Sequence, residues 1–228
     1  MRHTILPALL LICFATTAQI NKGSVLVGGD IIYLSNSYQA ENVLANSELK
    51  SRSSSFLISP MIGFAVKDNL LFGFGFGYSN NTTKNKSITD QERIVKTKTN
   101  NYSLSVWGRK FYPISKSFYF FLQGGLTGGI GRRNDKNDPV NFNNITENSF
   151  KIGVNAYPGI SYQLRKNFIL DAALNNLLSL NYEQRKTDEK ITNAVTNSRT
   201  NTSFNLSSSI ANGSNPLKIG VRWIIPKK

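Results

Sequence analysis

The residues of this chain that could do chemistry are acidic and basic side chains set within otherwise apolar segments. Each falls on the same face of its segment as the glycines and small polar residues. They are Asp30, Arg109, Lys151, Asp171, Lys218 and Arg222, with the neutral Gln123 and Asn175 on the same face. Carboxylates beside cations can move protons, bind a charged ligand or neutralise each other. Since an unpaired buried charge is very costly, we expect a paired network that packs the interior rather than a gate or a binding site.

The histidine and the cysteine of this chain both lie near its start, in a segment that we expect to be removed. Its one His and one Cys, His3 and Cys13, both lie in the first 18 residues. This stretch has a positive start, an apolar run over 5–14 and small residues up to Ala18, as secretory signals do. We expect 1–18 to be a signal peptide and 19–228 to be one domain without a thiol, a His-based triad or a His/Cys zinc site. No carboxylates pair at a fixed strand spacing either, so we expect no enzyme, no metal and no cofactor.

The charged residues must be positioned by β-strands, because apolar residues alternate with small or polar ones along much of the chain. The alternation is clearest over 56–66, 70–78 and 150–162. Eight strands are expected, at about 24–38, 52–67, 70–83, 98–112, 117–132, 148–164, 168–183 and 203–225. No later segment is apolar enough for a membrane helix, so a membrane-spanning form of this chain must be a closed barrel.

The connections between these strands alternate in length. Short turns are expected at 67–69, 113–116 and 165–167, and long Asn-, Thr- and Lys-rich loops at 39–51, 80–97, 133–147 and 184–202. This alternation is typical of outer-membrane barrels. The sequence therefore predicts an all-β fold, a closed antiparallel eight-stranded up-and-down transmembrane barrel with short periplasmic turns and long extracellular loops. Pro60 and Pro158 fall inside strands and are interpreted as a repeated bulge, and the path of 203–216 is left open.

The apolar face should point outward. Consecutive glycines such as Gly73, Gly75 and Gly77 protect nothing from water on an outer surface, but they fit a narrow lumen. The aromatic residues of the apolar face then form two interfacial girdles. The extracellular girdle is Tyr33, Tyr78, Tyr102, Phe150 and Tyr182, and the periplasmic girdle is Phe64, Tyr112, Phe118, Tyr162, Phe168 and Trp223. A soluble lipocalin-like barrel, with the Phe and Ile face inside, is the less favoured alternative.

The expected strands also predict partners within the charge network. Asp171 and Arg222 lie equally far from the periplasmic ends of antiparallel neighbours, and we expect them to face each other. By the same count Asp30 stands level with Lys218, and Arg109 projects from the opposite wall toward Asp171. Barrel shear can shift each pairing by about two residues.

Three ordered segments resemble the outer-membrane protein β-barrel domain family of small bacterial barrels. They are Ser59-Pro60-Met61-Ile62-Gly63-Phe64, Trp107-Gly108-Arg109-Lys110-Phe111-Tyr112-Pro113 and Pro158-Gly159-Ile160-Ser161-Tyr162. The last strand, with Lys218, Gly220, Trp223 and Ile225, resembles the signal read by the barrel-assembly machinery. It departs from that signal because Ile225 stands at the terminal aromatic position and Pro226-Lys227-Lys228 follow. The resemblance implies an outer-membrane barrel and that machinery as a partner during biogenesis.

The excess of positive charge indicates which partners the chain could bind. Its formal net charge is +14, and export argues against nucleic acid as the partner. The expected second long loop is basic, with Lys84, Lys86, Arg93, Lys96 and Lys98, and would face lipopolysaccharide phosphates at the cell surface. We expect a non-catalytic outer-membrane protein with a structural or surface-interaction role. A small-solute channel is the alternative.

Overall fold

The computed structural model describes residues 19–42, 47–88, 92–138, 144–174, 177–191, 194–208 and 217–227. In that part of the chain every regular element is a strand, and no helix is long and apolar enough to cross a membrane. The strands are β1 Val25–Asn42, β2 Ser47–Lys67, β3 Leu70–Ile88, β4 Glu92–Pro113, β5 Phe118–Asp138, β6 Asn144–Arg165, β7 Phe168–Leu174, β8 Leu178–Ile191, β9 Ala194–Ser208 and β10 Leu217–Ile225. The expected signal peptide lies outside the described residues.

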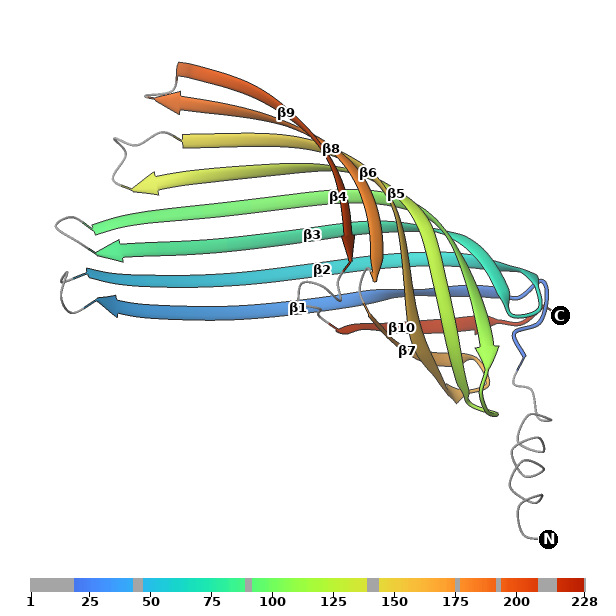
Figure 1. Ribbon diagram of the computed structural model, residues 1–228. Coiled ribbons are helices and arrows are strands. Elements are labelled where there is room, and N and C mark those ends of the chain that lie inside the picture. The colour runs from blue at the N-terminus through green and yellow to red at the C-terminus, as the bar shows by residue number, and fades with distance from the viewer. Residues whose placement is uncertain are drawn as a thin grey trace, which may run out of the picture.

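Eight of these strands close a ring. Antiparallel pairing runs from β1 through β6 in chain order, then to β7 and β10, and β10 pairs with β1 to complete the circle. Figure 1 shows this closed part at the end of the molecule where the short turns and the C-terminus lie. The expected eight-stranded up-and-down barrel is therefore confirmed.

The segments expected to be long extracellular loops are largely strand instead. β1 to β6 run on past the apolar region, and the predicted second loop over 80–97 is mostly the upper parts of β3 and β4. A strand outside the membrane has no apolar face, so the alternation disappears from the sequence while the hydrogen-bonded ladder continues. The many Thr residues favour strands. The prediction of loops was wrong for this reason.

The last two expected strands are each divided. Segment 168–183 is β7 followed by the start of β8, and segment 203–225 contains the end of β9 and all of β10. β8 and β9 form a hairpin that pairs with the upper part of β6. Above the ring, the described part of β1 beyond Ile31 pairs with β2 alone and β9 pairs with β8 alone. The upper sheet is therefore an open trough on top of a closed barrel (Figure 1).

Pro60 does not produce the bulge that was expected of it. The β1–β2 register runs unbroken through Gly29 and Pro60, and the β2–β3 irregularity lies at 65–67. Pro158 pairs regularly with Leu122 of β5. On its other side, β6 changes partner from β8 at Ala156 to β7 at Gly159. Proline has no backbone N–H to donate. Each of these two prolines has a described ladder partner on one side only, so the missing donor can face the other side, where no ladder bond is lost.

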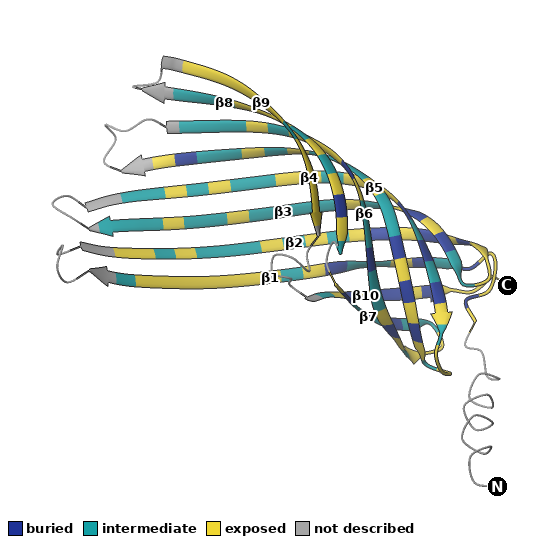
Figure 2. Ribbon diagram, viewed as in Figure 1, coloured by how far each residue is buried: buried dark blue, intermediate teal, exposed yellow. Residues whose placement is uncertain are grey.

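The apolar side chains of the ring point outward. Phe74, Leu104 and Val106 are among the exposed ones, whereas Trp107, Phe111 and other inward side chains are buried. Figure 2 shows exposed and buried positions alternating along the strands of the ring. The girdles contain ring pairs at both ends, with centroids 5.2 Å apart for Tyr78 and Tyr102 and 6.2 Å apart for Phe168 and Trp223. An exposed apolar belt with aromatic edges fits a barrel in lipid and not a soluble one.

Candidate functional site in the lumen and on the outer face

A buried charge network crosses the lumen of the ring. Asp30 of β1 binds two cations of β10, Arg222 through one carboxylate oxygen and Lys218 Nζ at 2.5 Å through the other. Asp171 of β7 accepts a bond from Arg109 Nη1 of β4 at 2.5 Å and lies 3.3 Å from Arg222 Nε. The side chains of Asp30, Asp171, Arg109 and Arg222 are at most 2% exposed. The five residues therefore form one chain of ion pairs from wall to wall.

Neutral groups complete this network. Ser161 donates to Asp171 at 2.6 Å, and Gln123 accepts from Arg109 Nε at 2.7 Å. Gly220 lies opposite both Asp30 and Asp171, and a Cβ there would collide with Asp30 and with the Arg222 guanidinium. Gly220 was expected only as part of the assembly signal, so its packing role in the network was not predicted. Ser161 lies between the outward residues Ile160 and Tyr162, so the alternation along β6 could have shown that it faces the network.

The structure brings together most of the residues expected in the network. Asp30 with Lys218 and Asp171 with Arg109 are ion pairs, and Asp171 reaches Arg222 diagonally because its direct partner is Gly220. Lys151 is the exception. It lies higher in the lumen, on an exposed part of β6, and forms no ion pair with the described members of the network. Asn175 lies outside the described residues.

Aromatic and aliphatic side chains fill the lumen around and below the charges. The Arg109 guanidinium carbon lies 4.1 Å from the Phe121 ring centroid and 5.9 Å from that of Trp107. Ile20 precedes β1 and is 2% exposed, and its backbone bonds to Asn69 across the periplasmic mouth. The buried core also includes Leu26, Leu71, Phe111, Tyr119, Ile169 and Ile224. The lower lumen is thus packed with side chains.

This packing predicts that the purified protein forms no steady pore. Ions would have to cross both the paired charges and the apolar layer beneath them, where no side chain can move without opening a void. In planar bilayers at neutral pH we expect no reproducible single-channel steps. Stepwise conductance from folded, heat-modifiable protein would contradict this and favour the channel alternative.

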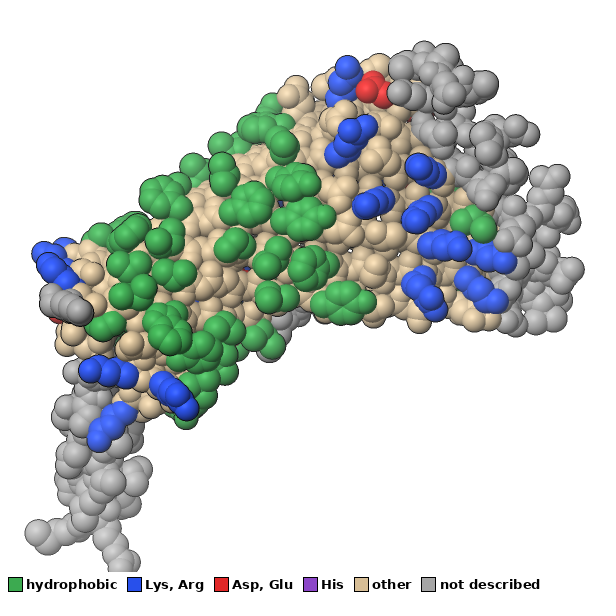
Figure 3. All heavy atoms as spheres, turned by 180° about the vertical axis from the view of Figure 1, so that it is seen from behind, with side chains coloured by type: hydrophobic (Ala, Val, Ile, Leu, Met, Phe, Trp, Pro, Cys, Tyr) green, Lys and Arg blue, Asp and Glu red, His purple; other side chains and the backbone are tan. Residues whose placement is uncertain are grey.

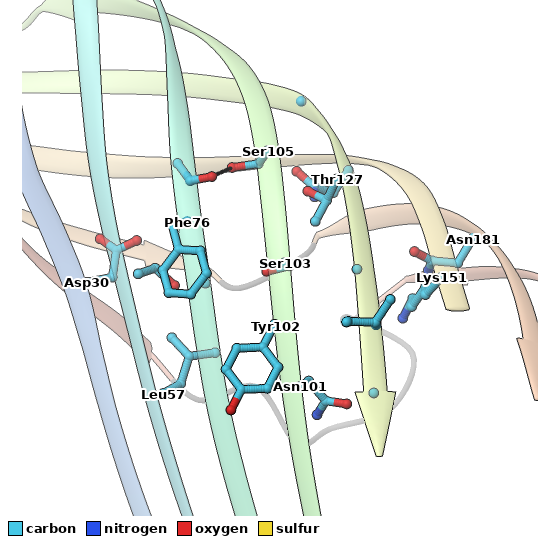
Figure 4. A pocket seen from close by; sticks show the side chains of 18 of the residues that line it. Asp30, Leu57, Phe76, Asn101, Tyr102, Ser103, Ser105, Thr127, Lys151 and Asn181 are labelled. Carbon is cyan, nitrogen blue, oxygen red and sulfur yellow. Dashed lines mark hydrogen bonds between the residues drawn. The ribbon is translucent and has the colours of Figure 1, made fainter. Parts of the chain in front are cut away.

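The charge network and the packed side chains below it form a plug in the lower lumen. Above this plug the lumen opens into a cavity of about 630 Å³, which we call the cup. Figure 4 shows side chains of several strands facing it, among them Ser103, Ser105, Thr127, Lys151 and Asn181. Higher on its wall, Arg133 bonds to Asp135 at 2.8 Å, and Arg185 bonds to Glu183 at 2.9 Å. Hydrogen bonding to Asp135 raises the pKa of Arg133, and hydrogen bonding to Glu183 raises that of Arg185.

The outer face of the trough carries rows of cations. Arg52 lies opposite Lys84, Lys84 opposite Lys96, and Lys96 opposite Lys136, so one row crosses β2 to β5. Among the described side chains of the trough, Lys50, Lys86, Lys98, Arg132 and Lys186 also point outward. Figure 3 shows blue side chains gathered beside the green apolar belt.

These rows correct the predicted basic loop. Lys84 and Lys86 lie on β3, Lys96 and Lys98 on β4, and none of the four lies in a loop. The backbone of Arg93 belongs to β4, and its side chain is outside the described part. The cations of β2, β5 and β8 were missed because neighbouring rows appear only once the register is known.

The residues of the expected assembly signal divide between the two faces of β10. Lys218 and Gly220 face the lumen, whereas Trp223 and Ile225 are 53% and 49% exposed on the outside. Among the described residues, no group of His, Cys, Asp or Glu is arranged to hold a metal ion.

Comparisons with known proteins find fold similarity only. No protein-family model matches the sequence, and no curated protein matches it. Among solved structures, it is similar to a major outer membrane protein of Thermus thermophilus, at 10% identity and a TM-score of 0.47 over 92% of this chain and 100% of that one. It is also similar to Neisserial surface protein A, at 17% identity and a TM-score of 0.39 over 91% and 99%. With scores this low, the fold is assigned from the chain's own closed ring, apolar belt and aromatic girdles, which make it a transmembrane β-barrel of the outer-membrane type.

Proposed function

We propose that this protein is a non-catalytic barrel of the bacterial outer membrane that binds the phosphate groups of lipopolysaccharide through its outward cation rows. The observation that carries the proposal is the row formed by Arg52, Lys84, Lys96 and Lys136, each directly opposite the next. Like charges placed directly across strands destabilise a sheet. An anionic layer around the barrel would turn this cost into a gain.

The position of the row agrees with such a layer. On β3, Lys84 lies six residues above the girdle residue Tyr78, and on β4, Lys98 lies four above Tyr102. With a rise of ~3.3 Å per residue and a tilt of ~40°, these cations stand roughly 10–15 Å above the apolar belt. This is the height at which the phosphorylated sugars of the outer leaflet would surround the barrel.

The distribution of carboxylates supports the same function. Glu147 and Glu183 line the cup, and the buried Asp135 shares their inward parity. At this level, Asp188 on β8 is the carboxylate among the described residues that lies on the outward face. Positive charge is therefore concentrated on the surface that faces the membrane's outer leaflet. A role as a small-solute channel is less favoured because the lower lumen is filled.

The test is a triple variant, Arg52→Gln, Lys84→Gln and Lys96→Gln, compared with wild type for binding of purified lipopolysaccharide in detergent. Each basic group near an anionic surface contributes on the order of 1 kcal/mol, so we expect binding at least tenfold weaker at low salt. The difference should shrink as ionic strength rises.

The matched control is the double variant Lys116→Gln and Lys166→Gln, which removes exposed cations in turns at the opposite end. We expect this control to bind lipopolysaccharide like wild type. Equal weakening by the two variants, or equal binding of dephosphorylated lipopolysaccharide by wild type, would show that the outer row is not the phosphate site.

A further inference from the structure

The cup is a blind chamber that opens on the cell-surface side. Its lower end is closed by the ion-pair network and by Trp107, which lines the cup and whose ring centroid lies 5.9 Å from the Arg109 guanidinium carbon. Its volume of about 630 Å³ falls within the range of small-ligand sites. A ligand could therefore enter from outside but could not pass through.

Hydroxyl and amide side chains are the commonest kind in the wall of the cup. Ten of the lining residues are Ser, Thr, Asn or Gln, among them Ser103, Ser105, Thr127, Asn155 and Asn181. Hydroxyls and amides can each donate and accept hydrogen bonds, which suits a ligand whose own groups are mainly hydroxyls. Figure 4 shows Ser105, Thr127 and Asn181 facing this space from three separate strands.

Aromatic groups form the floor. Trp107 is 3% exposed and Tyr157 is 4% exposed, and both line the cup. The indole N–H of Trp107 is buried and has no hydrogen-bond partner within the described structure. The ring packs against Gly63 and Gly73, so this nitrogen faces protein and not the open cup. With so little exposed area, the two aromatic groups close the cup from below.

Among the described charged side chains that line the cup, all but one are held in ion pairs. Arg133 and Arg185 are bound by carboxylates, and Lys218 is bound by Asp30. Lys151 also lines the cup, and none of the described carboxylates forms an ion pair with it (Figure 4).

Glu183 lies directly opposite Lys151, and Arg185 binds both Glu183 and Glu147, so carboxylates stand close to this lysine. Since Lys151 has no ion pair of its own among the described residues, it can donate to an acidic group of a ligand. The nearby carboxylates favour a ligand with one negative charge over a strongly charged one.

We propose that the cup binds a short oligosaccharide that carries an acidic sugar, with Lys151 holding the acidic group and the hydroxyl and amide side chains of the wall bonding to the sugar hydroxyls. This goes beyond the phosphate-binding role of the outer face and does not depend on it. The ligand reaches the site from the extracellular side, and the plug below prevents its transport.

The test uses full-length folded protein on a printed array of short oligosaccharides, some neutral and some bearing a uronic or sialic acid. We expect saturable binding to acidic members. Hits are confirmed in solution with the Trp223→Phe variant, whose remaining tryptophan, Trp107, should change its fluorescence on binding. Two variants should each lower the affinity at least tenfold: Thr127→Trp, which fills the cup, and Lys151→Gln, an exposed change that does not threaten folding.

The matched control is Leu126→Trp, which adds the same side chain one residue away on the lipid-facing side of β5. It should bind the array like wild type. Heat-modifiable migration on SDS gels checks that every variant is folded. The proposal is overturned if no oligosaccharide binds, if neutral members bind as well as acidic ones, or if Lys151→Gln binds like wild type.

Discussion

Replacing Asp171 by Asn is expected to lower the free energy of unfolding by about 3–5 kcal/mol, the usual cost of removing one partner from a buried ion pair. Asp171 holds Arg109 Nη1 at 2.5 Å and Arg222 Nε at 3.3 Å inside the barrel. The network has two carboxylates and three cations, a sum of −2 and +3, or +1. The variant raises this to +2 and leaves the guanidinium groups of Arg109 and Arg222, each 1% exposed, without their shared carboxylate.

The measurement is urea unfolding of the barrel in lipid vesicles, followed by loss of heat-modifiable migration. The control is Asp188→Asn, a carboxylate at the outer end of β8 whose bond to Ser198 is exposed, and it should cost less than about 1 kcal/mol. Combining Asp171→Asn with Arg109→Met should recover part of the loss, because the uncompensated guanidinium is then removed. Losses that simply add would mean that the two groups are not coupled.

The choice of Arg109 in that cycle shows how far sequence reasoning could go. Inward parity was enough to place Asp30, Arg109, Asp171, Lys218 and Arg222 in one lumen. Parity could not say which pairs are direct, because shear offsets neighbouring strands. Gly220 lies between Asp30 and Asp171, so Arg222 sits diagonally to Asp171 and binds Asp30 as well.

The same limit explains the mistaken loops. Within the membrane, lipid on one side and a packed lumen on the other impose an alternation that is visible along 70–78. Beyond Tyr78 both faces of β3 meet polar surroundings, and the sequence Ser79-Asn80-Asn81-Thr82-Thr83 reads as a loop although it is strand.

The strands beyond the belt carry the outer cation rows and the upper wall of the cup, with Arg133 and Arg185. The lower wall, with Ser105 and Thr127, lies at the level of the belt, where the alternation predicted the strands. The outer cation rows were therefore the hardest part to predict.

Replacing Phe74 by Arg is expected to cost about 2–4 kcal/mol in lipid, as charges do on the outer face of a barrel near the midplane. Phe74 is 59% exposed and lies midway along the outward apolar residues of β3, between Phe72 and Phe76. Its side chain has no water to reach at that depth. The free energy of unfolding in vesicles measures the effect, and Phe74→Leu, which stays apolar, should cost less than about 1.5 kcal/mol.

The glycines on either side of Phe74 test the inside-outside assignment further. A Cβ at Gly75 would meet the Ser105 hydroxyl at 2.7 Å, a flexible group that can turn away, so Gly75→Ser should cost much less than Phe74→Arg. A Cβ at Gly73 would collide with the backbone oxygen of Ile62 and with the Trp107 ring, neither of which can move easily. Gly73→Ser should therefore cost clearly more than Gly75→Ser. If Gly75→Ser proved more damaging than Phe74→Arg, the apolar face of β3 would have to line the lumen, and the assignment of inward and outward faces would be reversed.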